Sequence, residues 1–415
     1  MSKIKDITTE IVLNGRKKNQ CYIHPCMAVA PAGVFSENPM VMFGITQQTA
    51  SDMGPMHYSY TTDLGKTWAP IFETENIYGI PLEDDIFEIP WLYPFYHRKT
   101  KTMMALGFTM FHRDSSDPSD YNRFKFEWFV FGIKQSMGFA IWDHQKRDFN
   151  DWQKIPEPDN FPRVRLFINS WHEESDGTIL IPYYTETTES EDTEHEGIPG
   201  VGVIKFGFDG EKFKILEVGA EVRIEKKYGI CEPCIAKFKS KYYMTIRSEI
   251  FEKNYEGHDQ KMYWSVSDDG INFSKPKNWC WDDGSNVETE NTMQYLIGHK
   301  DTLFLIYTRI NDLCQKRVFR SRAPLFIAAV DVSKNCLIKE TERVIFPEHD
   351  GARMGNFNAK NVLEDEIWVM DAEWVQCQDH QKKEGERFWS RGVNNGVHYN
   401  KIQYIGDVLL AKVKF

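Results

Sequence analysis

The chain has 415 residues and a formal net charge of −11, and 41% of its residues are hydrophobic. This apolar content is enough for a packed core, which excludes disorder as the main state, and the negative charge argues against nucleic acid as a ligand. No apolar run reaches the roughly 18 residues of a membrane helix, and the first residues lack the layout of a secretory signal. We therefore expect a cytoplasmic protein, or a periplasmic or secreted one if a leader was removed.

Short apolar segments rich in aromatic and β-branched residues recur along the whole chain, while 3.6-residue periodicity is scarce. Six of them are expected to be strands, at residues 39–48, 101–111, 179–187, 241–250, 302–310 and 366–375. This pattern predicts an all-β protein built from many similar strands.

One turn pattern repeats along the chain. Its clearest copy is TTDLGKTW at Thr61–Trp68, and a weaker copy is VSDDGINF at Val266–Phe273. In both, the Asp side chain is placed to cap turn amides and the Gly to take a positive φ. Degenerate copies at Trp152, Phe213 and Leu337 give a period of about 60 residues, which is typical of a β-propeller with four strands per blade.

The repeats predict a single six-bladed propeller domain that spans residues 1–415. The sixth unit lacks a fourth strand, and residues 4–13 are expected to supply it, because this closes the ring and removes two exposed sheet edges. A seven-bladed ring is the alternative if the long second unit hides a blade. The six units cover residues 20–71, 89–155, 165–224, 228–280, 289–346 and 355–415.

With these turns the sequence resembles the sialidase (neuraminidase) superfamily, whose members are six-bladed propellers with Asp-box, or BNR, repeats. The strongest match is Glu232-Pro233 followed by Arg247 at the end of the next strand. The resemblance implies that Glu232 lies beside the nucleophile and that Arg247 and Arg309 bind the substrate carboxylate. It also implies that Asp52 is the acid/base residue.

Two segments depart from the sialidase pattern. Where the first arginine is expected, the sequence reads Tyr22-Ile23-His24-Pro25, and Gly355-Asn356-Phe357-Asn358 stands where the nucleophilic Tyr is expected. The chain is therefore similar to an uncharacterised subgroup of sialidase-like proteins. Without that Tyr, we expect an inverting reaction with two carboxyl groups.

The connections between second and third strands, and those between blades, open on one face of a propeller around a central funnel. They carry arginines that bind carboxylates bidentately, aromatic rings that cover sugar faces, and carboxylic acids for acid/base work. The catalytic candidates are Asp52, Glu232 and Glu290; the substrate-binding candidates are Arg247, Arg309, Arg353, His24, Asn356, Glu373 and Trp374.

Three functions stay open. The favoured one is an exo-acting glycoside hydrolase that releases a terminal, acidic sugar. A polysaccharide lyase or histidine-dependent glycosidase acting on uronate-containing glycans would use His24 or Tyr184 to take a proton. A non-catalytic propeller that binds glycan or protein is the third, because fold alone does not establish activity. No cofactor or metal is expected, since the single CxxC, Cys231 and Cys234, has no second pair at zinc-site spacing.

Overall fold

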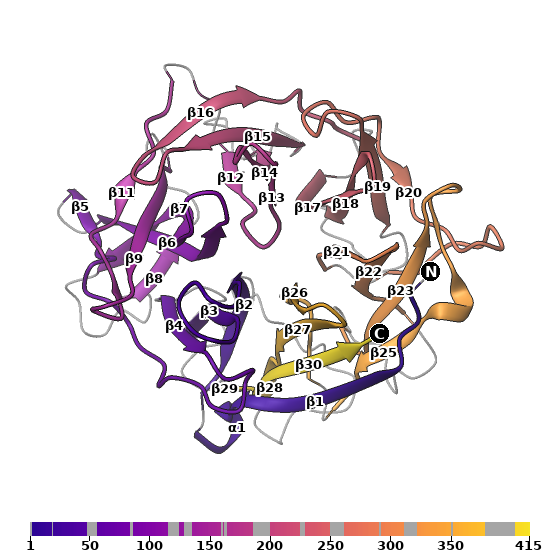
Figure 1. Ribbon diagram of the computed structural model, residues 1–415, viewed down its shortest axis with the longest axis horizontal. Helices are drawn as coiled ribbons and strands as arrows, with labels where there is room; N and C mark the ends of the chain where they lie inside the picture. The colour runs from indigo at the N-terminus through magenta and orange to yellow at the C-terminus, as the bar shows by residue number, and fades with distance from the viewer. Residues whose placement is uncertain are drawn as a thin grey trace, which may run out of the picture.

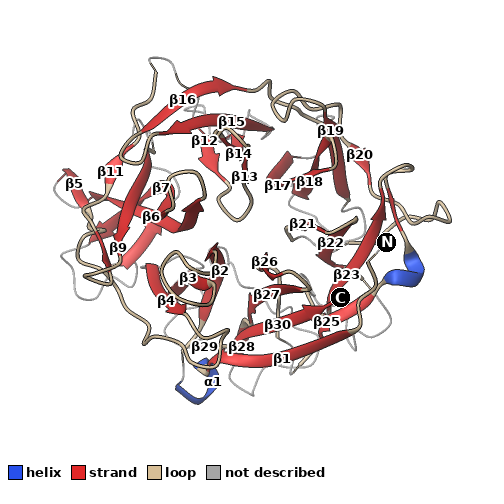
Figure 2. Ribbon diagram, viewed as in Figure 1, coloured by secondary structure: helices blue, strands red, loops and turns tan. Residues whose placement is uncertain are grey.

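The computed structural model describes the chain in fifteen ranges, and all structural statements below refer to them. Within these ranges, six antiparallel sheets stand radially around a central axis (Figures 1 and 2). The fold is therefore an all-β six-bladed propeller, as the sequence predicts, and the seven-bladed alternative is wrong. The described residues are 2–18, 20–47, 56–83, 86–114, 124–127, 135–158, 161, 164–185, 200–224, 229–249, 261–289, 292–310, 322–349, 352–377 and 403–415.

The first three blades follow one another along the chain. Blade one contains β2 (Tyr22–Ala30), β3 (Met40–Gln47) and β4 (Met56–Thr61). Blade two contains β5 (Ile80–Glu83), β6 (Ile86–His97), β7 (Thr102–Asp114), β8 (Phe124–Glu127), β9 (Met137–Asp143), β10 (Asp148–Phe149) and β11 (Gln153–Lys154). Blade three contains β12 (Val164–Leu166), β13 (His172–Glu173), β14 (Ile179–Thr185), β15 (Val201–Phe208) and β16 (Phe213–Val218). The extra length of the second unit adds β8 to the sheet of that blade and forms no seventh sheet.

The remaining blades repeat the same meander. Blade four contains β17 (Gly229–Phe238), β18 (Lys241–Glu249), β19 (Met262–Ser267) and β20 (Lys277–Asn278). Blade five contains β21 (Tyr295–His299), β22 (Thr302–Thr308), β23 (Leu325–Asp331), β24 (Cys336–Leu337) and β25 (Arg343–Phe346), with the 3-10 helix η1 (Lys339–Thr341). Blade six contains β26 (Asn358–Leu363), β27 (Glu366–Ala372), β30 (Val408–Lys414) and β1 (Asp6–Leu13). A short helix α1 (Gly15–Lys18) and a hairpin of β28 (Val375–Cys377) and β29 (Gln403–Ile405) complete the elements.

The N-terminal strand closes the ring. β1 pairs antiparallel with β30, with Asp6 opposite Lys414 and Leu13 opposite Val408. It forms the outer strand of blade six, so strands from the two ends of the chain share one sheet (Figure 1). The predicted closure by an N-terminal strand is confirmed.

The turn at Thr61–Trp68 holds its shape through Asp63. Its Oδ1 accepts the N–H of Thr67 at 2.9 Å and its Oδ2 accepts the Thr67 hydroxyl at 2.6 Å, while Gly65 has a φ of 80°. Trp68 at the end of the turn lies 5.2 Å from the ring of Phe43 and 6.3 Å from that of Trp368. The turn thus brings an aromatic ring between blades one and six.

One buried side chain links two inner strands and a turn of blade three near the axis. Asn358 of β26 accepts the N–H of Met27 at 3.0 Å and donates to the carbonyl oxygen of Asn169 at 2.7 Å. A second link joins Ser170 to Ile235, whose N–H donates to the Ser170 hydroxyl at 2.7 Å. These bonds join blades one, three, four and six near the axis. Among the described residues, no helix is long and apolar enough to cross a membrane.

Candidate functional site

Two inner strands start with the same distortion at the funnel face. β2 reads His24-Pro25-Cys26 and β17 reads Glu232-Pro233-Cys234, and in each the register of pairing shifts across the proline. His24 has a φ of 58° and Glu232 a φ of 48°, which is a left-handed conformation that costs a residue with a side chain roughly 1–2 kcal/mol. Such strain persists only where the surroundings enforce it, and it clusters at functional sites.

These two bulges face each other. Blades one and four are three steps apart in a ring of six, so β2 and β17 lie across the axis from one another (Figure 1). His24 and Glu232 therefore occupy equivalent places on opposite sides of the axis, at the end of the ring where the funnel is predicted.

The Glu232 carboxylate forms an ion pair with Arg247. The Arg247 Nη1 donates to Glu232 Oε1 at 2.7 Å, and the arginine is only 7% exposed. The two residues meet because Arg247 pairs with Cys231 in the β17–β18 ladder, one position before the bulge. The second oxygen of Glu232, Oε2, is buried and has no hydrogen-bond partner among the described residues. Buried polar atoms of this kind are uncommon and need a ligand or an ordered water.

A tyrosine and an arginine of blade three adjoin this pair. Tyr184 is the second-last residue of β14, and Arg165 lies opposite it on β12, with the guanidinium carbon 5.9 Å from the ring centre. Burial raises the pKa of Tyr184 well above its usual value; the charge of Arg165 lowers it, and that of nearby Glu232 raises it further. Tyr184 therefore keeps its proton at neutral pH. Arg165 also donates to Gln135 Oε1 at 3.3 Å, and the amide nitrogen of Gln135 is buried with no partner in the described part of the chain.

Aromatic rings line the wall near His24. Its imidazole meets Trp91 edge to face at 5.4 Å, and Trp91 lies 5.6 Å from Tyr93. On the other side, Trp374 packs with Cys21 and Ile23, directly before His24. Trp91, Tyr93 and Trp374 are mostly buried, with 4–8% of their surface exposed, so these rings chiefly pack around His24.

Arg353 and Trp374 come together as a pair. Their backbones exchange two hydrogen bonds, at 3.1 and 3.0 Å, and the Arg353 guanidinium carbon lies 5.4 Å from the Trp374 ring centre. Arg353 is 6% exposed, and its neighbour Met354 donates its N–H to the carbonyl of Arg322, which is itself 5% exposed. Two buried arginines thus stand at the junction of blades five and six.

Asn356 contacts a carboxyl group that was not among the sequence candidates. The side chain of Asp371 accepts the N–H of Ala372 at 2.7 Å and of Gly355 at 3.4 Å, and the Asn356 N–H bonds to it as well. Burial raises the pKa of Asp371 to about 8, although these N–H groups oppose the shift. Asp371 is therefore mainly protonated at neutral pH.

Two candidates hold other parts of the fold. Arg309 donates from Nε and Nη2 to both oxygens of Glu342, each at 2.7 Å, and lies 5.8 Å from the ring centre of Trp281. Glu373 accepts Arg16 Nε of α1 at 2.7 Å and lies 3.2 Å from Nδ1 of His349. Through these contacts Arg309 and Glu373 stabilise the fold. That they bind substrate stays a prediction. Asp52 and Glu290 lie outside the described residues.

The site candidates chosen from the sequence do not include Arg165, Arg322 or Asp371. Residues 24–26 and 232–234 share the pattern x-Pro-Cys. This shared pattern indicates that the two segments lie at equivalent positions near the start of the inner strand in two blades. Asp371 lies inside an apolar strand, WVMDA, where a lone acid in a buried run is the only sign of it.

Comparisons with known proteins identify the fold and no family. The chain resembles a protein of unknown function from Dyadobacter fermentans, with 13% identity and a TM-score of 0.56 over 98% of this chain and 99% of that one. It also resembles the NanB sialidase from Streptococcus pneumoniae, with 10% identity and a TM-score of 0.59 over 95% of this chain and 68% of that one. A leech intramolecular trans-sialidase matches with 10% identity and a TM-score of 0.53, over 99% and 70% of the two chains.

These likenesses establish a sialidase-like propeller fold and nothing finer, because the identities are so low. No protein-family model matches the sequence, and no curated protein matches it either.

Proposed function

We propose that this protein is a sialidase-like glycoside hydrolase that removes a terminal acidic sugar from a glycan, with its active site in the funnel. The observation that carries the proposal is the Glu232–Arg247 ion pair, held at 2.7 Å on a strained bulge beside Arg165. A carboxylate next to buried guanidinium groups suits an acidic sugar, since guanidinium binds carboxylate bidentately and carboxyl groups supply glycosidic acid/base chemistry. The sialidase-like fold adds support.

The residues divide into binding and reacting groups. Arg247, with Arg165 and Arg353, would hold the sugar carboxylate, while the rings of Trp91 and Trp374 cover its apolar face. Glu232 or Glu290 would activate the attacking water, and Asp52 would protonate the leaving oxygen. Tyr184 keeps its proton because its pKa is raised, which supports the inverting route that uses two carboxyl groups and no Tyr nucleophile.

A lyase remains the second candidate, because His24 occupies a strained bulge equivalent to that of Glu232. In that reaction His24 would take the proton next to a uronate carboxylate neutralised by arginine. The two chemistries differ in their products: a lyase leaves a conjugated double bond that absorbs in the ultraviolet, and a hydrolase does not.

The test is turnover of fluorogenic N-acetylneuraminate, glucuronate and galacturonate glycosides, with ultraviolet absorbance followed on uronate polymers. Glu232→Gln is expected to lower kcat/KM about 100-fold or more, as loss of general acid/base catalysis does. Arg247→Met is expected to raise KM, because it removes a contact to the substrate carboxylate.

Glu221→Gln is the matched control. Glu221 pairs with Arg223 at 2.8 Å, and its side chain is 25% exposed against 24% for Glu232. It accepts the hydroxyl of Thr185 of β14 at 2.7 Å, and the next residue, Val222, bridges Val201 of β15. Full activity in Glu232→Gln, or an equal loss in Glu221→Gln, would contradict the proposal. Binding of an acidic sugar without turnover of any substrate would favour a non-catalytic propeller.

A further inference from the structure

A second cavity lies on the axis at the face opposite the funnel. It has a volume of about 290 Å³, and residues of all six blades line it, among them Val29, Arg98, Trp171, Ile235, Tyr295 and Lys360. Its size is near the lower end of ligand pockets, which run from roughly 300 to 1,000 Å³.

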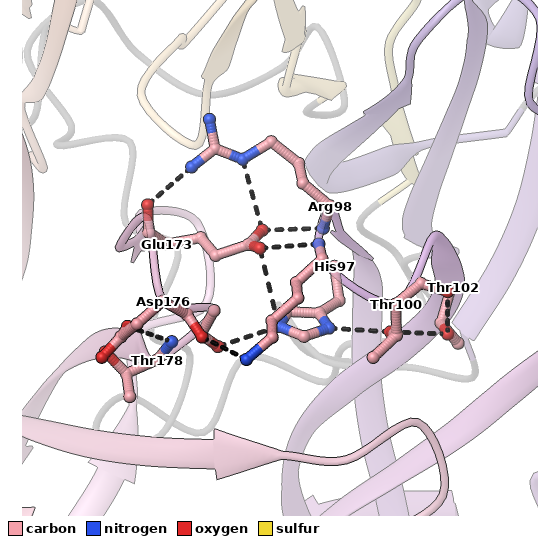
Figure 3. A network of polar contacts seen from close by, with 9 residues as sticks. His97, Arg98, Thr100, Thr102, Glu173, Asp176 and Thr178 are labelled. Atoms are coloured by element: carbon pink, nitrogen blue, oxygen red, sulfur yellow. Dashed lines mark hydrogen bonds and ion pairs between the residues drawn. The ribbon is translucent and has the colours of Figure 1, made fainter.

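The acidic group at the rim of this cavity is already satisfied. Glu173 accepts the N–H groups of Arg98 and Lys99 at 2.7 and 2.9 Å, and also Arg98 Nε at 3.3 Å. His97 Nε2 lies 3.6 Å from the same carboxylate, and Figure 3 shows these groups gathered around it. Glu173 therefore has no charge left unbalanced for a cationic ligand.

The second cation at the rim is paired as well. Lys237 Nζ lies 2.7 Å from Glu174 Oε2, and the hydroxyl of Tyr242 donates to the same carboxylate. Burial lowers the pKa of His172 to about 4, so its ring is neutral at pH 7. Neither residue adds a free charge to the cavity.

Lys360 differs from all of these. Its Nζ donates to the hydroxyl of Tyr295 at 3.1 Å and lies 5.0 Å from the ring centre of Trp171. Within the described part of the chain, no carboxylate lies within ion-pair distance of this nitrogen. Burial lowers the pKa of Lys360, and the nearby thiols of Cys26 and Cys234 oppose this shift. A buried ammonium group that has no carboxylate within ion-pair distance is costly unless a ligand supplies the negative charge.

We propose that this cavity is a second ligand site, in which Lys360 binds the carboxylate of a small organic acid. One unpaired ammonium balances one negative charge, which favours a monoanionic carboxylate over a phosphate dianion. Val29, Ile235 and Ile297 contribute aliphatic side chains beside the polar part of the lining, so a small carboxylic acid with an apolar body can contact both. The site is independent of the proposed function, because it does not share residues with the funnel.

Calorimetry with sodium benzoate tests the site, with benzamide as the neutral isostere and with inorganic phosphate and N-acetylneuraminate as further probes. Benzoate is expected to bind the wild type and benzamide is not. In Lys360→Met the Kd for benzoate is expected to rise at least about tenfold, as removal of one charge-assisted hydrogen bond implies. Lys277→Met is the control, because Lys277 lies 5.6 Å over the ring of Trp264 on blade four, outside the cavity.

Trace acetylation of the wild type locates the ligand without any variant. Benzoate is expected to slow acetylation of Lys360, measured by mass spectrometry, and to leave Lys277 unchanged. If N-acetylneuraminate slows acetylation of Lys360 as benzoate does, the site also accepts acidic sugars. The proposal would be overturned if benzamide bound as tightly as benzoate, or if Lys360→Met bound benzoate as tightly as the wild type. It would also be overturned if the protein preferred phosphate, if benzoate did not slow acetylation of Lys360, or if neither benzoate nor N-acetylneuraminate bound. Glu232→Gln is expected to bind benzoate normally, which separates this site from the funnel.

Discussion

Replacement of Asn358 by alanine tests how the propeller is held at its axis. The side chain is fully buried on the inner strand of blade six. Its amide accepts the Met27 N–H of blade one and donates to the Asn169 carbonyl of blade three. Alanine removes both partners and leaves two backbone groups buried between the blades.

The cost follows from those two groups. A buried donor or acceptor without a partner costs about 1–3 kcal/mol, so two of them cost about 2–6 kcal/mol. The space left by the amide is polar on two sides and admits a water, which restores part of the loss. We therefore expect the free energy of unfolding to fall by about 2–4 kcal/mol.

Urea unfolding followed by tryptophan fluorescence measures this loss, with Asn361→Ala as the control. Asn361 lies on the same strand and its amide bonds to Gly298 O at 2.9 Å and His299 Nδ1 at 2.7 Å, but it is exposed to solvent. Its replacement is expected to cost less than about 1 kcal/mol, since water takes over the bonds. A loss below about 0.5 kcal/mol in Asn358→Ala, or equal losses in both variants, would refute the reasoning.

Three further predictions concern charged groups. Because the pKa of Asp371 is raised to about 8, its ionisation opposes folding, and stability should fall as pH rises from about 4 to about 8. Asp371→Asn should come closest to the wild type in melting temperature at about pH 4 and should exceed it by a growing margin up to pH 9. The pKa of Asp63 is lowered to about 2, chiefly by the hydroxyl of Thr67, so Asp63→Asn should lower the melting temperature at pH 7 and converge with the wild type as pH falls towards 2. Arg309→Met should cost about 1.5–3 kcal/mol of stability through loss of its paired bonds to Glu342, and an unchanged melting temperature with a raised KM would instead place Arg309 in the site.

The architecture could be predicted because it depends on periodic features that each blade repeats. The turn at Thr61–Trp68 carries its own geometry in an Asp, a Gly and an aromatic residue, and its spacing sets the size of the blade. The strand at residues 4–13 is predicted to pair with blade six, because without an outer strand that blade would have an open edge. Such features are local, so a single sequence contains them.

The site could be predicted only where two residues lie on neighbouring strands of one hairpin. Glu232 and Arg247 meet because the β17–β18 ladder brings them together. Arg309 instead finds Glu342 on the outer part of its blade, and Glu373 finds Arg16 on α1. The direction of such a side chain and its partner from a distant part of the chain depend on tertiary packing. The position of a loop in the sequence does not specify that packing.

The bulges at His24 and Glu232 both hold the backbone in an unfavourable conformation. A left-handed residue followed by proline is disfavoured twice, by its own side chain and by the ring after it, and a strand that only builds scaffold would use glycine there. In both bulges the residue after the proline is a buried thiol bonded to another blade. Cys26 Sγ donates to Ile168 O of blade three at 3.8 Å, and Cys234 Sγ accepts the Leu296 N–H of blade five at 3.2 Å. These anchors hold the inner strand in place, so the strain falls on His24 and Glu232. Because the surrounding blades maintain that cost at equivalent positions on opposite sides of the axis, we expect these two side chains to have a role in the candidate site.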